Sequence, residues 1–108
     1  MSRPCKPLAA GAQWTGADPG AVYATSSDSF DVAIRVMGAD ERLAAPAALP
    51  EEVGAILQGI FRIETSEETI DLVAGEAIIV PPGEPREWTC LEGRGVLYRV
   101  LVTKPVTP

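Results

Sequence analysis

The stretch that decides the fold runs from residue 75 to residue 90 and reads GEAIIVPPGEPREWTC. It consists of a glycine, a short apolar segment, a Pro-Pro-Gly turn and a second segment that starts at Arg86. Gly75 and Gly83 can adopt the positive φ that tight turns require, and two successive prolines end a strand because proline has no backbone N–H to donate. The stretch therefore predicts two short strands joined by a turn.

Similar short segments surround this stretch. TIDLVAG before it and GVLYRVLVT after it are rich in β-branched residues, and FDVAIRVM at residues 30–37 alternates strictly between two faces. Glycine or proline separates these segments at the regular spacing that is typical of β-sandwiches and barrels. We therefore predict an all-β fold, with residues 1–25 as an N-terminal arm and residues 26–108 as one β-barrel domain.

Two segments leave the choice between helix and strand open. In PEEVGAILQGIFRIE, residues 50–64, apolar residues recur at helical spacing. Against a helix, Gly54 and Gly59 would each cost about 1 kcal/mol, and residues 60–64 alternate as a strand. The segment ADERLAA, residues 39–45, is compatible with a turn or two of helix.

Composition excludes several classes of partner. The chain has 108 residues, enough for one core, and 9 basic against 15 acidic side chains give it a net charge of −6. A chain of this charge repels phosphate groups and offers no basic stripe, so we expect neither nucleic acid nor an anionic membrane as a partner.

The sequence shows neither the pattern of a signal peptide or membrane-spanning helix nor a cysteine motif. Pro4, Lys6 and Pro7 interrupt the apolar run that a signal peptide needs, and no run approaches the roughly 18 apolar residues of a membrane-spanning helix. Cys5 and Cys90 form neither a disulfide framework nor a CxxC motif. We therefore expect a cytoplasmic protein with free thiols.

The spacing of the opening stretch is specific. Gly75, Pro81, Gly83, Arg86 and Cys90 follow the pattern G-x5-P-x-G-x2-R-x3-C. This pattern resembles the second motif of the cupins, G-x5-P-x-G-x2-H-x3-N, with arginine and cysteine in place of the histidine and asparagine. The chain is therefore similar to a small single-domain cupin of the RmlC-like superfamily, and the resemblance implies a jelly roll, the double-stranded β-helix barrel.

The first cupin motif, G-x5-H-x-H-x3-4-E-x6-G, is matched only in its second half. Six residues separate Glu52 from Gly59, as the motif requires. The resemblance implies that residues 51–61 form a strand, a turn and a strand rather than a helix.

In many cupins, the histidines and the glutamate of these motifs bind a divalent metal. At the matching positions only Glu52 keeps a metal-ligand type, since Arg86 replaces the last histidine. The first two histidines are replaced by alanine or proline at residues 45–48. A single carboxylate does not supply the three or four N, O or S donors that a transition metal takes. We predict no metal and no cofactor.

The resemblance places Glu52 and Arg86 inside one barrel, and three roles for Arg86 stay open. In the first, Arg86 neutralises Glu52 and fills a site that binds no ligand. In the second, it points to solvent. In the third, the N–H groups of its planar guanidinium bind the carboxylate of a small ligand. Strand alternation places Trp88 and Cys90 beside Arg86, and Gln58 on the face of Glu52. Of the neighbours Tyr98 and Arg99, we expect Tyr98 to face inward. The predicted ligand-binding set is Glu52, Gln58, Arg86, Trp88, Cys90 and Tyr98.

Three functions remain as hypotheses. The first is a metal-free cupin that binds a small, carboxylate-bearing molecule inside the barrel. The second is a metal-independent isomerase, epimerase or lyase acting on a carboxylated or sugar-like metabolite, with Glu52 as base and Tyr98 as acid. The third is a ligandless structural or interaction domain. Small cupins are commonly dimers, so we also expect a homodimer that uses Trp14 and Tyr23 of the arm.

Overall fold

The all-β class predicted from the sequence is confirmed. The computed structural model describes residues 5–8 and 14–103, which contain nine strands and one turn of 3-10 helix. Parts of the predicted arm, residues 1–4 and 9–13, and the last residues of the predicted barrel, 104–108, lie outside the described residues. The elements are η1 (Trp14–Gly16), β1 (Val22–Ser26), β2 (Phe30–Met37), β3 (Arg42–Ala44), β4 (Glu51–Gln58), β5 (Ile60–Thr65), β6 (Thr69–Val73), β7 (Ala77–Val80), β8 (Arg86–Cys90) and β9 (Gly95–Val102).

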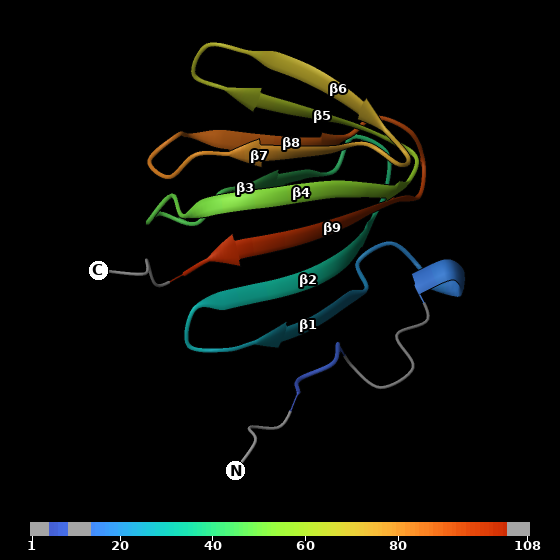
Figure 1. Ribbon diagram of the computed structural model, residues 1–108. Coiled ribbons are helices and arrows are strands. Elements are labelled where there is room, and N and C mark those ends of the chain that lie inside the picture. The colour runs from blue at the N-terminus through green and yellow to red at the C-terminus, as the bar shows by residue number, and fades with distance from the viewer. Residues whose placement is uncertain (1–4, 9–13, 104–108) are drawn as a thin grey trace.

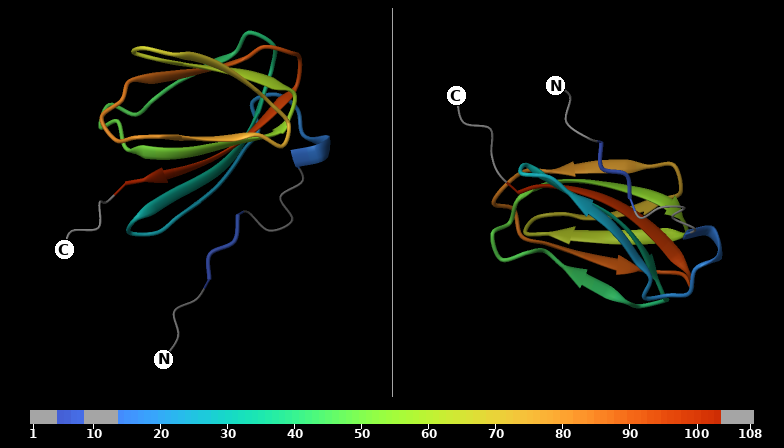
Figure 2. Two further views of the ribbon diagram at one scale, coloured as in Figure 1. Left: turned by 45° about the horizontal axis from the view of Figure 1, so that its top comes forward. Right: turned by 90° about the horizontal axis from the view of Figure 1, so that it is seen from below.

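The strands form two antiparallel sheets that face each other (Figures 1 and 2). The larger sheet has the order β1-β2-β9-β4-β7 and the smaller has the order β3-β8-β5-β6. The last strand, β9, lies at the centre of the larger sheet, where it pairs with β2 on one side and β4 on the other. Strands far apart in sequence are therefore neighbours, as in a jelly roll.

The structure settles both ambiguous segments as strands. Residues 51–65 form β4 and β5, separated by Gly59 with a φ of 87°, so the helical spacing was misleading and the strand-turn-strand expectation is correct. Residues 39–45, which are compatible with a turn or two of helix, instead contain β3, because Arg42–Ala44 pair with β8. Gly75 and Gly83 have φ values of 92° and 82°, as their turns require.

Trp14 and the residues of β1, all within the predicted arm or at its end, belong to the larger sheet. The predicted boundary at residue 25 falls inside β1, which pairs with β2 along all five of its residues. Trp14 packs on the outer face of this sheet, against the buried side chains of Ile34, Val36 and Val96. The larger sheet therefore buries apolar side chains on both faces.

The main core lies between the two sheets. Trp88 and Phe61 are both fully buried there, and their rings meet edge to face with centroids 6.3 Å apart. The other members of this core are Met37, Ile56, Ile63, Leu72, Val80, Cys90 and Leu97. No helix in the described part of the chain is long and apolar enough to cross a membrane.

Candidate functional site

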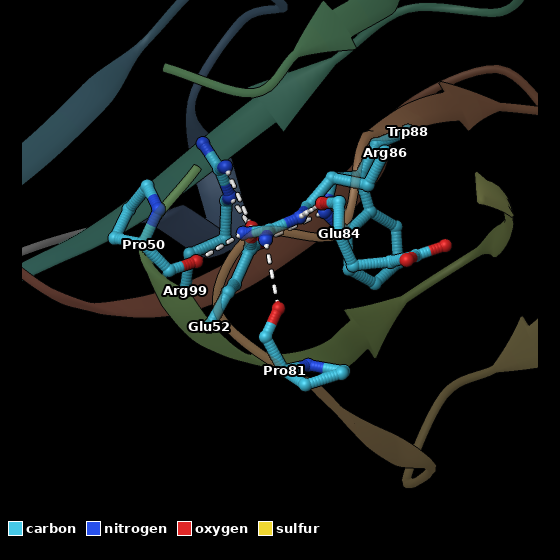
Figure 3. Close-up of polar contacts among 7 residues, drawn as sticks. All are labelled: Pro50, Glu52, Pro81, Glu84, Arg86, Trp88 and Arg99. Atoms are coloured by element: carbon cyan, nitrogen blue, oxygen red, sulfur yellow. Dashed lines mark hydrogen bonds and ion pairs between the residues drawn. The ribbon is translucent and has the colours of Figure 1, made fainter. Parts of the chain in front are cut away.

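A buried glutamate lies between the sheets and is held by side chains from two other strands (Figure 3). Glu52, the second residue of β4, has no exposed surface. Its Oε2 accepts hydrogen bonds from the indole N–H of Trp88 at 2.8 Å and from Nε of Arg99 at 2.6 Å. Its Oε1 accepts from Nη1 of Arg86 at 3.1 Å and Nη2 of Arg99 at 3.0 Å. The carboxylate thus has four donors, from β8 and β9.

Almost all N–H groups of Arg86 donate hydrogen bonds to other groups of the protein. Besides Glu52, its guanidinium donates to the carbonyls of Pro50 at 2.6 Å, Pro81 at 3.2 Å and Glu84 at 3.0 Å. These four contacts use four of the five N–H groups of an arginine, and the side chain is fully buried. Arg86 therefore faces the interior, where it ties the loops before β4 and before β8 to the barrel.

Arg99 donates hydrogen bonds from one edge of its guanidinium only. Its Nε and Nη2 form a side-on pair with Glu52, while its Nη1 donates to no described residue. Every fully buried side-chain polar atom in the described part of the chain has a partner. The Nη1 atom must therefore reach solvent, which agrees with the 7% exposure of the side chain. In Figure 3, one end of this guanidinium points away from Glu52.

The cluster carries one surplus positive charge, because two guanidinium groups surround one carboxylate. Burial alone raises the pKa of Glu52, but the hydrogen bond and charge of Arg99, with further hydrogen bonds from Trp88 and Arg86, outweigh burial and lower it. Glu52 is therefore ionised at neutral pH.

The structure separates the six predicted site residues into two groups. Glu52, Arg86 and Trp88 come together as expected, but Cys90 lies in the apolar core, where its thiol contacts the carbonyl of Glu92 at 3.0 Å. Burial raises the pKa of the Cys90 thiol, which opposes a role as nucleophile.

Gln58 lies away from the cluster. A shift in the pairing of β4 with β9 between Ile56 and Gln58 interrupts the alternation on which its placement depended. Its side-chain amide instead exchanges hydrogen bonds with Arg94.

The expectation that Tyr98 faces inward is wrong. In β9, Arg99 lies opposite Gly54 and takes the inward position, while Tyr98 packs on the outer face with Ile34 and Val96. Glu52 and Tyr98 thus lie on opposite faces of one sheet, and they cannot act as base and acid on one substrate. The sequence carries no signal that separates the two, since Arg99 shares its strand face with Leu97 and Leu101, and Tyr98 shares the other face with Val96 and Val100.

The arrangement opposes a bound cation. The groups that surround Glu52 are two guanidinium ions and an indole, none of which is a metal ligand. Within residues 5–8 and 14–103, no group of three or more His, Cys, Asp or Glu side chains lies close enough to hold a metal ion.

Comparisons with known proteins give structural relatives only. No protein-family profile matches the chain, and no curated protein matches its sequence. A cupin superfamily protein from Desulfitobacterium hafniense superposes with a TM-score of 0.70 at 20% identity, over 82% of this chain and 83% of that one. KdgF from Halomonas sp. superposes with a TM-score of 0.66 at 14% identity, over 78% and 80%.

An RmlC-like cupin from Shewanella frigidimarina also superposes, with a TM-score of 0.65 at 16% identity, over 79% of this chain and 78% of that one. This chain therefore has the fold of the RmlC-like cupin superfamily, in one small domain.

Proposed function

We propose that this cupin binds a small anionic molecule without a metal ion, and that Arg99 makes the central contact. The surplus positive charge of the cluster around Glu52 supports this function. A buried charge is unfavourable unless it is paired, and Glu52 can neutralise only one of the two arginines. An anion at the open edge of Arg99 would neutralise the other.

The geometry of Arg99 supports a carboxylate as that anion. Its side-on pair with Glu52 leaves free the end of the guanidinium that carries Nη1. The end of a guanidinium presents two parallel N–H groups, which match the two oxygens of a carboxylate. Arg86, the first candidate for this role, has only one N–H group left and is fully buried. The proposed contact therefore moves from Arg86 to Arg99.

The alternative of a ligandless scaffold also has an observation in its favour. The indole of Trp88 lies directly against Gly54, and apolar side chains fill the barrel beyond it. A ligand would thus bind at the side of the barrel and not in its centre. The two functions differ in whether the wild-type protein binds any carboxylate.

Calorimetry and thermal unfolding of the purified chain in low salt would test the proposal. Acetate, pentanoate and succinate should raise the melting temperature above that in matched sodium chloride, with binding detected by isothermal titration. Arg99→Met should abolish this effect, because it keeps the apolar stem but removes the donors. Arg99→Lys, which keeps a cation beside Glu52, covers the case in which the first variant does not fold.

Arg62→Met is a matched control, since it removes an arginine whose partner Asp71 is about half exposed on the smaller sheet. It should leave carboxylate binding unchanged. If no carboxylate stabilises the wild-type protein more than chloride does, the proposal is wrong and the scaffold function is favoured.

A further inference from the structure

A groove of about 350 Å³ opens beside Arg99, on the inner face of the larger sheet where β1 and β2 continue past the barrel core. This volume lies at the lower end of the range for small-molecule sites, which is about 300–1,000 Å³. Its lining includes two arginines and one aspartate, namely Arg99, Arg35 and Asp31. The groove therefore suits a small ligand with charged ends.

Strand pairing places these side chains in three parallel rows. In the middle row Ala24, Ala33 and Arg99 are successive neighbours across β1, β2 and β9. Because alanine side chains are short, this row forms a low floor that ends at Arg99. The open end of the guanidinium thus faces a space that no bulky side chain of its own row fills.

The rows on either side carry opposite charges. Arg35 lies opposite Val22 in one row, and Asp31 lies opposite Ser26 in the other. Arg35 and Asp31 are four residues apart on β2, about 13 Å at the usual rise of a strand. Neither forms an ion pair with a described residue, and Asp31 is exposed. Arg35 at one end, Asp31 at the other and Arg99 in the row between them make a polarised groove.

We infer that this groove binds a small amino-carboxylate. Its carboxylate lies between Arg99 and Arg35, and its amino group lies against Asp31, with the hydroxyl of Ser26 beside it. The inference rests on the proposed function, since Arg99 is the anion contact in both. It adds the substrate class and two residues, Arg35 and Asp31, that determine specificity.

A set of three probes tests the polarity of the groove by isothermal titration with the full chain. The probes are 5-aminopentanoate, pentanoate and pentylamine, which share one carbon chain and differ in their charged ends. Wild type should bind 5-aminopentanoate about tenfold more tightly than pentanoate, the factor expected for one hydrogen-bonded charge, and pentylamine most weakly.

Two variants assign the ends. Asp31→Asn should remove the preference for 5-aminopentanoate and leave the affinity for pentanoate unchanged. Arg35→Met should weaken both carboxylates by about tenfold or more. Asp71→Asn and Arg62→Met change the same residue types on the smaller sheet and should have no effect. Asp31 is exposed and Arg35 is half-buried, so these variants should fold, which circular dichroism would verify.

The outcomes separate the two proposals. If pentanoate binds and Arg99→Met abolishes it, but neither Asp31→Asn nor Arg35→Met changes any affinity, the groove is not the site and the proposed function still stands. If the wild-type protein binds none of the probes, both proposals are overturned.

Discussion

At the scale of single residues, Gly54 makes room for the site. The six-membered ring of Trp88 lies where a side chain at residue 54 would begin, and this position holds the indole N–H against Glu52. A Cβ added at Gly54 would come within 2.8 Å of Cη2 of Trp88, closer than real Cβ atoms approach. The absence of one methyl group thus allows Trp88 to be a donor to the buried carboxylate.

We predict that Gly54→Ala lowers the free energy of unfolding by about 1–3 kcal/mol, the usual cost of overpacking a core. The indole of Trp88 must move, so its N–H signal in the NMR spectrum should shift as well. Gly93→Ala is the matched control, since a Cβ at Gly93 meets no atom within 4 Å. Equal stability of the two variants in urea unfolding would contradict this account of Trp88.

At the scale of elements, the outer face and the edge of the larger sheet are the surfaces relevant to homodimer formation. The homodimer itself stays a prediction. Trp14, expected to contact a partner, packs on its own sheet. Elsewhere in this sheet, Phe30 at the start of β2 is 45% exposed and Ile79 of β7 is 66% exposed. β1 is an edge strand of the described sheet, and edges invite pairing with a second chain.

We expect light scattering at high micromolar concentration to give the mass of a dimer, and Phe30→Glu to convert it to a monomer by placing a charge beside β1. Val73→Glu is the control, because Val73 is 46% exposed but lies on the smaller sheet. A monomeric wild-type protein would remove the dimer from consideration.

At the scale of the whole molecule, the cluster around Glu52 should make stability depend on pH. The pKa of Glu52 in the folded protein lies below its ordinary value of 4.5. The carboxylate therefore contributes its full stability above about pH 4.5, and this contribution is lost as the pH falls through the lowered folded-state pKa. Asp71, which is exposed, and Glu84, which is half-buried, also have lowered pKa values and act in the same direction.

Glu52→Gln isolates the buried group. At pH 7 it should lower the free energy of unfolding by about 3–5 kcal/mol, because it leaves two buried guanidinium groups without a counter-ion. Between pH 5 and pH 3 its stability should fall less steeply than that of the wild-type protein, as measured by urea unfolding at a series of pH values. Parallel pH dependences would show that Glu52 does not act through its charge.

Much of the fold was predictable because it depends on local signals. The strict alternation of residues 30–37 and the glycines at residues 75 and 83 indicate strands and turns without any long-range information. The segment at residues 39–45 did not indicate a strand from its sequence, since only pairing with β8 makes Arg42–Ala44 one. The motif spacing brought Glu52 and Arg86 together correctly, and strand alternation from Arg86 added Trp88 on the same face of β8.

The sequence by itself determined most of the strands, the turns and three of the four side chains at the centre of the site. Only the tertiary structure decided that Arg99 and not Tyr98 faces inward, and that Arg86 donates most of its hydrogen bonds to backbone carbonyls. The physical reason is that alternation defines two faces of a strand but does not say which one is inside. Part of each face of the larger sheet is covered here, the inner one by the second sheet and the outer one by residues of the arm such as Trp14, so long-range strand pairing had to decide.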